Sequence, residues 1–218
     1  MEILVIGNEL NWKECKEKYG DSHRYQFAAD HSDVQKYFAK GLIIFDFEPK
    51  DISIYNREDL IIFLNSTKTT LTKLVNGKTI RASFFGFCGI PSFLNREILE
   101  LTILNNESRT ALENSCNQLS TKYKIVEDRI GMVTPRIICM IINEAYFAVE
   151  ENVASRADID LAMKLGTNYP FGPFEWCEKI GSKNVYELLN TVYNDTKDER
   201  YKICELLKVE ANSFTQRR

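Results

Sequence analysis

The sequence predicts an α/β domain with a mostly parallel sheet, followed by an all-helical domain. Short apolar, β-rich runs alternate with helix-like segments over residues 1–128. The pattern changes after about residue 129, where helical patterns follow one another. Strands that alternate with helices favour a parallel sheet with helices packed on its faces. We therefore place the boundary between the two domains near residue 128.

The first elements are two strands, each followed by a helix. EILVIG at 2–7 is typical of a buried strand, and NWKECKEKYG at 11–20 predicts a helix that Gly20 ends. A second strand is expected at 23–30. A second helix is expected at 32–41, with Ser32 as its N-cap.

The later elements of the first domain are mostly strands. Strands are expected at 42–47, 59–65, 82–88, 98–104 and 122–128, with a helix at 107–123 between the last two. In the second domain, the segment 133–153 is apolar almost all round and predicts a buried helix. Helices at 156–166, 173–180 and 184–194 follow, and the tail has mixed helices with a polar end.

Composition narrows the functional classes. The net charge of -3 gives no basic footprint for nucleic acid or an anionic membrane. The best apolar run, 137–142, is too short to span a bilayer, and the N-terminus does not resemble a signal peptide. Six cysteines are scattered without a C-x-x-C pair, so we expect neither a metal site nor a disulfide framework. A reducing, cytoplasmic location is the prediction.

The first strand runs into a turn that begins like a dinucleotide-binding turn. The expected pattern is G-x-G-x-x-G, and its three places hold Gly7, Glu9 and Trp12. Glu9 would hold a negative charge near a pyrophosphate, and Trp12 adds bulk where the smallest residue is needed. We interpret Gly7 as retained for folding and the phosphate site as given up.

The most specific segment is RADIDLAMKLGTNYPFGPFEWCEKIG, residues 156–181. It resembles the C-terminal domain of the 3-hydroxyacyl-CoA dehydrogenase family in Asp158 to Asp160, Met163 to Gly166 and Tyr169 to Glu175. A purely structural role, as a rigid helix–loop–helix corner, remains open for this segment. The resemblance covers residues 128–195 well. It implies an N-terminal Rossmann-like domain, which looks shorter than usual here.

The resemblance also implies an activity and partners. Family members oxidise 3-hydroxyacyl-CoA with NAD, and their helical domain usually forms a dimer. For this chain it implies NAD as the cofactor, an acyl-CoA-type ligand and a homodimer. The spacing of Asp30 from Gly7 resembles that of the family's ribose-binding acid. The other interpretation of Asp30 is a polar strand end.

The position of the family's catalytic histidine holds a different residue in this sequence. GFCGIPSFLNREILELT at 86–102 aligns without a gap with the family's histidine stretch, so Cys88 takes the place of the histidine and Glu100 that of its partner glutamate. A thiol is a poorer base than imidazole near neutral pH. Cys88 is also explained as a core residue, and Glu100 as a solvent-facing carboxylate. Neither His23 nor His31 fits the motif.

Two further family positions are affected. STKTTL at 66–71 is similar to the family's serine-containing run and would place Thr69 at the hydroxyl-binding position, although Thr69 or Thr70 could serve only as a helix N-cap. Pro135 falls on the family's interdomain asparagine and offers no polar side-chain atom.

Three hypotheses follow. The first is a family member that has lost standard NAD-linked turnover and retains an acyl-CoA-type ligand or a regulatory partner. The second is an active 3-hydroxyacyl-CoA dehydrogenase with an unusual site, in which a distant histidine or a water acts as the base. The third is an interaction module that dimerises through the helices at 133–153 and 156–181.

Overall fold

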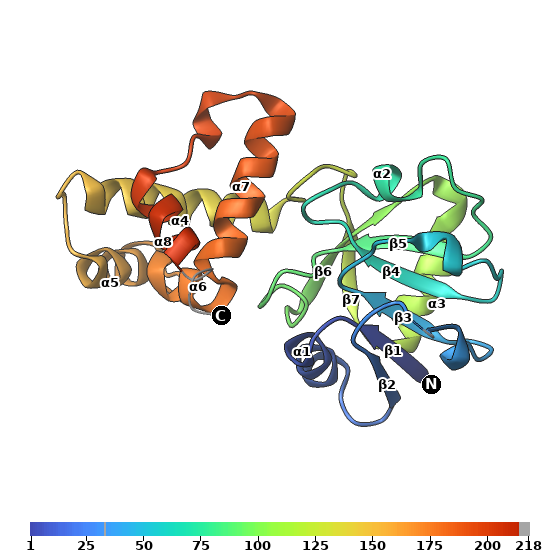
Figure 1. The fold of residues 1–218 in the computed structure, drawn as a ribbon. Coiled ribbons are helices and arrows are strands. Elements are labelled where there is room, and N and C mark those ends of the chain that lie inside the picture. The colour runs from blue at the N-terminus through green and yellow to red at the C-terminus, as the bar shows by residue number, and fades with distance from the viewer. Residues whose placement is uncertain (33, 214–218) are drawn as a thin grey trace. The chain divides into compact units, whose positions relative to one another are not determined.

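A computed structural model describes residues 1–32 and 34–213 of the chain. The chain divides into two compact units, Met1–Met132 and Val133–Arg218. The first unit contains the sheet, and the second contains helices only in the part that is described. Figure 1 shows the two units, with the sheet in blue to green and the helices α4 to α8 in yellow to red.

The sheet has seven strands in the order β2-β1-β3-β4-β5-β6-β7. The first five in this order pair in parallel, whereas β6 runs antiparallel to β5 and parallel to β7. This topology confirms the predicted mostly parallel sheet. The strands are β1 (Glu2–Ile6), β2 (Arg24–Ala28), β3 (Ile43–Asp46), β4 (Ile61–Asn65), β5 (Ser83–Phe87), β6 (Ile98–Ile103) and β7 (Lys122–Ile125).

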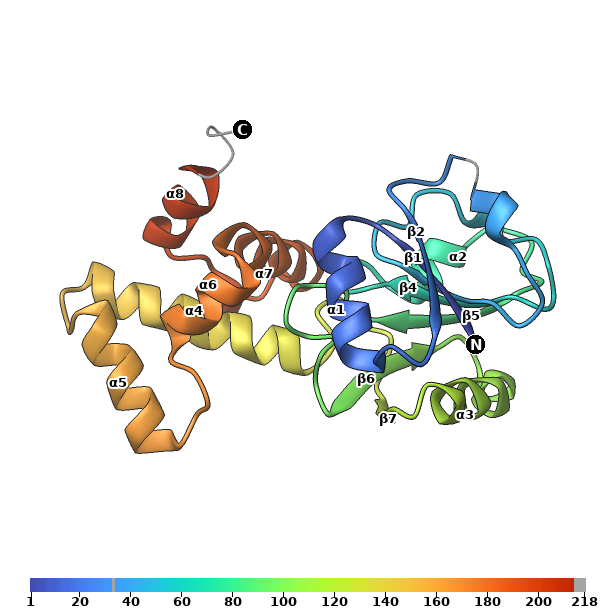
Figure 2. The same ribbon diagram turned by 90° about the horizontal axis from the view of Figure 1, so that it is seen from below.

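Both faces of the sheet are covered, because side chains alternate along each strand. On one face, Ile3 and Phe45 pack with residues of α1 (Glu9–Tyr19) and α3 (Arg109–Gln118). On the other, Leu4 and Ile44 pack with α2 (Leu71–Val75) and two 3-10 helices. Figure 2 shows α2 and α3 on opposite sides of the sheet. The core therefore has three layers.

One predicted helix of this unit is wrong. Instead of an α-helix over 32–41, the structure has a 3-10 helix at Val34–Tyr37, and residue 33 lies outside the described part. Only Val34 of this short helix is buried. Because helices in proteins are stabilised mainly by packing of an apolar face, so little burial does not sustain a longer helix here.

The second unit consists of the helices α4 (Thr134–Glu150), α5 (Arg156–Thr167), α6 (Pro173–Ile180), α7 (Ser182–Thr196) and α8 (Glu205–Ser213), with a 3-10 helix at Glu199–Tyr201. The long helix α4 packs against α6, α7 and α8. The prediction of a buried helix holds for only part of α4, since Ile138 and Ile142 are buried while Ile137 is 52% exposed. Its apolar residues thus cover one buried side and part of the surface.

Within residues 1–32 and 34–213, none of the helices combines the length and apolar character needed to cross a bilayer. The predicted cytoplasmic location stays a prediction.

Candidate functional site

Four of the predicted site residues follow the carboxyl ends of parallel strands. Gly7 follows β1, Asp30 follows β2, Thr69 follows β4 and Cys88 follows β5. Parallel strands end at the same edge of a sheet, and open α/β sheets bind ligands at that edge. The topology therefore places these residues along one edge, although several strand widths separate the first two from Cys88.

The turn after β1 is closed by its own side chains. The Asn8 Oδ1 atom accepts hydrogen bonds from the backbone N–H groups of Leu10 (2.9 Å) and Asn11 (3.1 Å). In return, the Asn11 Oδ1 atom accepts from the Asn8 N–H at 3.0 Å. These N–H groups at a helix N-terminus are the ones that would bind a phosphate. The capping box already satisfies three of them.

Gly7 is required by this turn itself. Its φ of +154° is rarely adopted by other residues, and a Cβ atom there would lie 2.6 Å from Asn11 Oδ1 and 3.1 Å from Phe47 Cβ. The retained glycine is thus explained by folding.

The two residues that replace the other glycines lie differently from each other. Glu9 is exposed in the first turn of α1, so its carboxylate adds negative charge to this end of the helix. Trp12 is half-buried and packs against the core cluster, with the Lys16 ammonium 5.0 Å from its ring centre. The packing of Trp12 against the core therefore gives no support to the expectation that its bulk blocks a phosphate.

Asp30 forms a local turn. Its Oδ1 atom accepts hydrogen bonds from the Ser32 N–H at 2.8 Å and from the Ser32 hydroxyl. These bonds lower the pKa of the Asp30 carboxyl. This geometry fits the interpretation of Asp30 as a polar strand end, and a role in ribose binding stays untested.

Cys88 and Glu100 lie on paired neighbouring segments of the sheet. In the antiparallel pair of β5 and β6, Phe87 lies opposite Leu101, so the same register continued by one residue sets Cys88 opposite Glu100. The Cys88 thiol is buried, and this burial raises its pKa to about 12, with Glu100 as a further cause. A thiol with so high a pKa remains protonated near neutral pH and is not a competent base or nucleophile there.

An asparagine that the sequence analysis did not single out fixes the backbone around Cys88. The Asn65 side chain donates to Phe47 O at 3.0 Å, while its Oδ1 atom accepts from Thr67 Oγ1 at 2.7 Å and from the Gly89 N–H at 3.0 Å. Asn65 thus joins the ends of β3, β4 and β5. An Asn at the end of a strand, before a Ser-Thr run, is the signal that could have identified it.

Thr69 is half-buried beside this network, whereas its neighbour Thr70 is the N-cap of α2 and accepts from the Lys73 N–H at 3.1 Å. The Asp128 carboxylate caps the same helix by accepting from Leu71 N (2.7 Å) and Thr72 N (2.8 Å). The capping role considered for this run therefore falls to Thr70. The hydroxyl-binding role of Thr69 stays a prediction.

A buried carboxylate lies at the end of β3, and the sequence analysis missed it. Asp46 is fully buried, and its Oδ2 atom accepts from the Tyr55 hydroxyl at 2.9 Å and lies 2.8 Å from His31 Nε2. The Glu48 N–H donates to its other oxygen at 3.1 Å. The hydrogen bond to Asp46 is the main cause that raises the pKa of His31.

His31 is therefore an imidazole held by a carboxylate, but it lies far from Cys88. Asp46 is on β3, and two strand spacings of about 4.8 Å separate β3 from β5, or roughly 10 Å in total. The Asp46 carboxylate that holds His31 therefore does not lie next to Cys88.

The motif of the second unit forms a structural corner. The Asp160 carboxylate accepts from the N–H groups of Phe174 (2.8 Å) and Glu175 (3.2 Å), which caps α6. A Cβ atom on Gly172 would lie 2.2 Å from Asp160 Oδ1, so only glycine fits there. The Glu175 carboxylate in turn accepts from the Gly172 N–H at 2.9 Å and pairs with Lys164.

Pro135 lies in the first turn of α4 and is buried. A proline is tolerated in a first helical turn, where its missing N–H would have no intrahelical partner. Over residues 1–32 and 34–213 there is also no group of three or more His, Cys, Asp or Glu side chains placed to hold a metal ion.

Comparison with known proteins gives a family match for the second unit. Residues 131–217 match the family model of the 3-hydroxyacyl-CoA dehydrogenase C-terminal domain. The helical unit belongs to the 3-hydroxyacyl-CoA dehydrogenase family. This match covers the segment that carries the Asp160 and Gly172 corner.

Relatives extend the match into the first unit. A 3-hydroxyadipyl-CoA dehydrogenase of Escherichia coli is 43% identical over 86 residues, which are 39% of this chain and 18% of that protein. A 3-hydroxybutyryl-CoA dehydrogenase of Clostridioides difficile is 29% identical over 156 residues, which are 69% of this chain and 55% of that protein. The chain thus spans about half of the length of these relatives or less.

The fold of the whole chain is that of solved 3-hydroxyacyl-CoA dehydrogenases. The (S)-3-hydroxybutyryl-CoA dehydrogenase of Ralstonia eutropha superposes with a TM-score of 0.71 at 20% identity, over 98% of this chain and 94% of that one. The predicted fold class, a Rossmann-like sheet domain followed by a helical domain of this family, is confirmed.

Proposed function

We propose that this chain is a 3-hydroxyacyl-CoA dehydrogenase relative that binds an acyl-CoA-type ligand but does not carry out ordinary NAD-linked turnover. The observation that carries the proposal is the capping box at α1, where Asn8 and Asn11 satisfy three of the N–H groups that a pyrophosphate needs. The exposed carboxylate of Glu9 at the same helix end further disfavours an anion. These residues do not fit NAD.

The missing base supports the same proposal. Hydride transfer from a hydroxyl needs a group that accepts the hydroxyl proton. The family position for that group holds Cys88, whose pKa is raised to about 12 by burial. Neither His23 nor His31 falls on that family position.

Calorimetry on the purified chain tests this function. We expect acetoacetyl-CoA to bind and NADH to show no binding at millimolar concentration, with no turnover of 3-hydroxybutyryl-CoA and NAD. Micromolar NADH binding with normal turnover would instead establish the second hypothesis, an active dehydrogenase with an atypical site.

Two variants separate the effect of the Glu9 charge on NADH binding from the effect of the capping box. Glu9→Gln removes only the charge, whereas Asn8→Gly removes the side chain that occupies the Leu10 and Asn11 N–H groups. If the capping box is the main obstacle, NADH binding should appear with Asn8→Gly before it appears with Glu9→Gln. The reverse order would assign the obstacle to charge.

We also propose a homodimer formed through the helical unit. The helix α5 buries only Asp160 and exposes Leu161 (53%) and Leu165 (78%). Exposed large apolar side chains on one helix are typical of an interface. Light scattering should give twice the chain mass, and Leu165→Glu should give a monomer. A wild-type monomer at all concentrations would contradict this proposal.

A further inference from the structure

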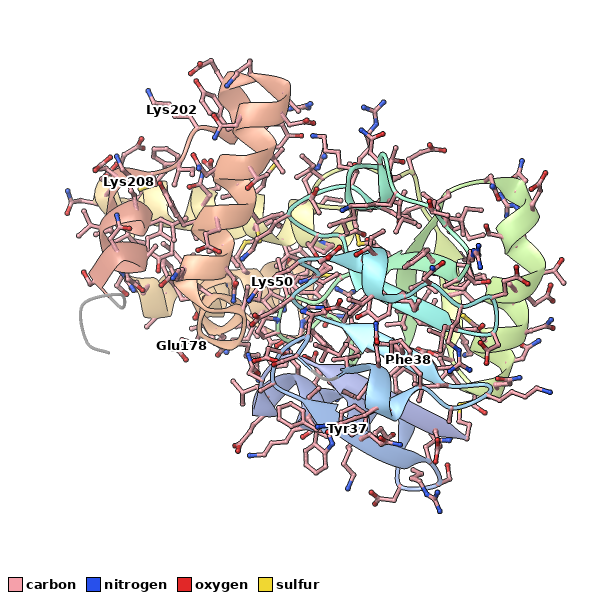
Figure 3. All side chains as sticks on the ribbon, turned by 45° about the vertical axis from the view of Figure 1, so that its right-hand side comes forward. Tyr37, Phe38, Lys50, Glu178, Lys202 and Lys208 are labelled. Carbon is pink, nitrogen blue, oxygen red and sulfur yellow. The ribbon has the colours of Figure 1, made fainter. Side chains whose placement is uncertain are left out.

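A hollow of about 290 Å³ opens at the carboxyl ends of β3 and β4, in the sheet unit. It is lined by Glu48, Pro49 and Lys50 from the segment after β3, by Asn65 at the end of β4, by Lys68 and Thr69 after β4, and by Leu74 of α2. Figure 3 labels Lys50, which lies on the segment after β3. The hollow is separate from the N-terminus of α1, where the expected phosphate site is closed.

The floor of the hollow is fixed before any ligand arrives. Asn65 is held by Phe47 O, Thr67 Oγ1 and the Gly89 N–H, so its side chain cannot swing away. The same bonds connect the floor to the backbone beside Cys88. A rigid floor lowers the entropy cost of ordering a site when a ligand binds.

The charge of the hollow favours an anion. Its lining holds two lysines and one glutamate. Glu48 lies 3.9 Å from the Lys50 ammonium, a loose pair between side chains that are 54% and 71% exposed. Lys50 also acts on the neighbouring strand end: after the hydrogen bonds from Ser32, its charge is a minor cause of the lowered pKa of Asp30, and it partly offsets the raised pKa of His31. Thr69 adds a hydroxyl that can donate a hydrogen bond.

We propose that this hollow binds an anionic group, a phosphate or a carboxylate, between Lys50 and Lys68, with the Thr69 hydroxyl as a hydrogen-bond donor. The volume suits one such group and the start of a chain, not a dinucleotide. This inference rests on the proposed function, because we take the anionic group to be part of the acyl-CoA-type ligand.

The test measures affinity for inorganic phosphate, for succinate and for acetoacetyl-CoA by calorimetry on the full chain. Lys50→Gln and Lys68→Gln should each weaken phosphate binding at least fivefold, and the double variant at least twentyfold. Lys68→Arg should retain most of the affinity. The matched control is Lys13→Gln, an exposed lysine of α1 that does not line the hollow. Thermal melting of each variant reports whether it folds.

The outcomes separate this inference from the proposed function. Equal loss of phosphate binding in Lys13→Gln, or none in the double variant, would overturn the hollow as an anion site. If acetoacetyl-CoA binds the double variant as tightly as the wild type, the ligand lies elsewhere and only this inference fails. If phosphate or succinate depends on the two lysines and acetoacetyl-CoA never binds, the hollow stands and the proposed function fails. Tighter succinate than phosphate binding would identify a carboxylate as the preferred group.

Discussion

The two units of this chain are stabilised in different ways. In the helical unit, Asp160, Gly172 and Glu175 fix one another through backbone hydrogen bonds and steric fit. In the sheet unit, buried apolar strands form the expected sheet, and the turn after β1 is closed by the side chains of Asn8 and Asn11. The comparison shows that the motif of the helical unit is explained by contacts that stabilise the fold, whereas the sheet depends on its apolar strands rather than on a motif.

The largest expected effect comes from breaking the helical corner. Gly172→Ala places a methyl group 2.2 Å from Asp160 Oδ1 and displaces the carboxylate that caps α6. We expect the free energy of unfolding to fall by about 3 kcal/mol. Urea denaturation followed by circular dichroism measures it. The control is Gly166→Ala in α5, where nothing lies within 4 Å and stability should rise slightly. If the two variants change the unfolding free energy equally, the close fit between Gly172 and Asp160 does not stabilise the corner.

The next effect is a pH dependence in the sheet unit, which the helical corner should not share. The pKa of His31 is raised by its hydrogen bond to Asp46. The stability that this pair contributes is therefore complete below the unfolded histidine pKa of about 6.5 and is lost as pH rises through the higher folded value. The unfolding free energy of the wild type should fall as pH rises above about 6.5.

Asp46→Asn keeps the shape of the side chain but removes the charge that favours protonated His31. In this variant the fall in stability over the same pH range should be smaller. An unchanged fall would assign the pH dependence to other groups.

A smaller effect is expected at the α1 turn. Asn8→Ala removes the acceptor for the Leu10 and Asn11 N–H groups and should cost about 1 kcal/mol of unfolding free energy. Asn8→Ser, which can still cap the helix, should cost less. Both are measured by urea denaturation. If Asn8→Ala leaves the unfolding free energy unchanged, the cap does not stabilise this turn. The proposal that the capped turn excludes a pyrophosphate would then lose its main support.

The smallest expected effect is slow modification of the cysteine thiols in the native chain. The six cysteines are all free and buried, and the pKa of Cys88 is raised to about 12 by burial. A thiol reagent such as dithiobisnitrobenzoate should react slowly with the native chain near neutral pH and with six thiols after unfolding. One fast native thiol that disappears in Cys88→Ala would show that this position retains a reactive group.

Much of the sheet could be predicted because its strands are short apolar runs. Ile3 to Ile6 and Ile43 to Phe45 are buried on both faces, and such runs have little alternative to a central strand. The prediction of a helix at 32–41 was wrong because it used only local signals, such as Ser32 and Gly41 at the two ends. These signals do not show whether another element packs against the segment, and only Val34 of the short helix is buried.

The candidate site could be predicted only where the chain itself sets the geometry. Cys88 comes opposite Glu100 because β5 and β6, which are neighbours along the chain, pair in antiparallel register. The contacts of Asp46 with His31 and Tyr55, in contrast, join three separate segments across a strand end. Nothing local in the sequence specifies which of several polar side chains will share a buried carboxylate.

The reciprocal bonds between Asn8 and Asn11 also bear on how this chain can evolve. Each asparagine supports the other, so the stability effects of substituting the two residues are expected to be non-additive. A single change toward a glycine-rich turn would therefore lose stability on its own. A chain that adopts such a turn at this helix would have to change both asparagines together.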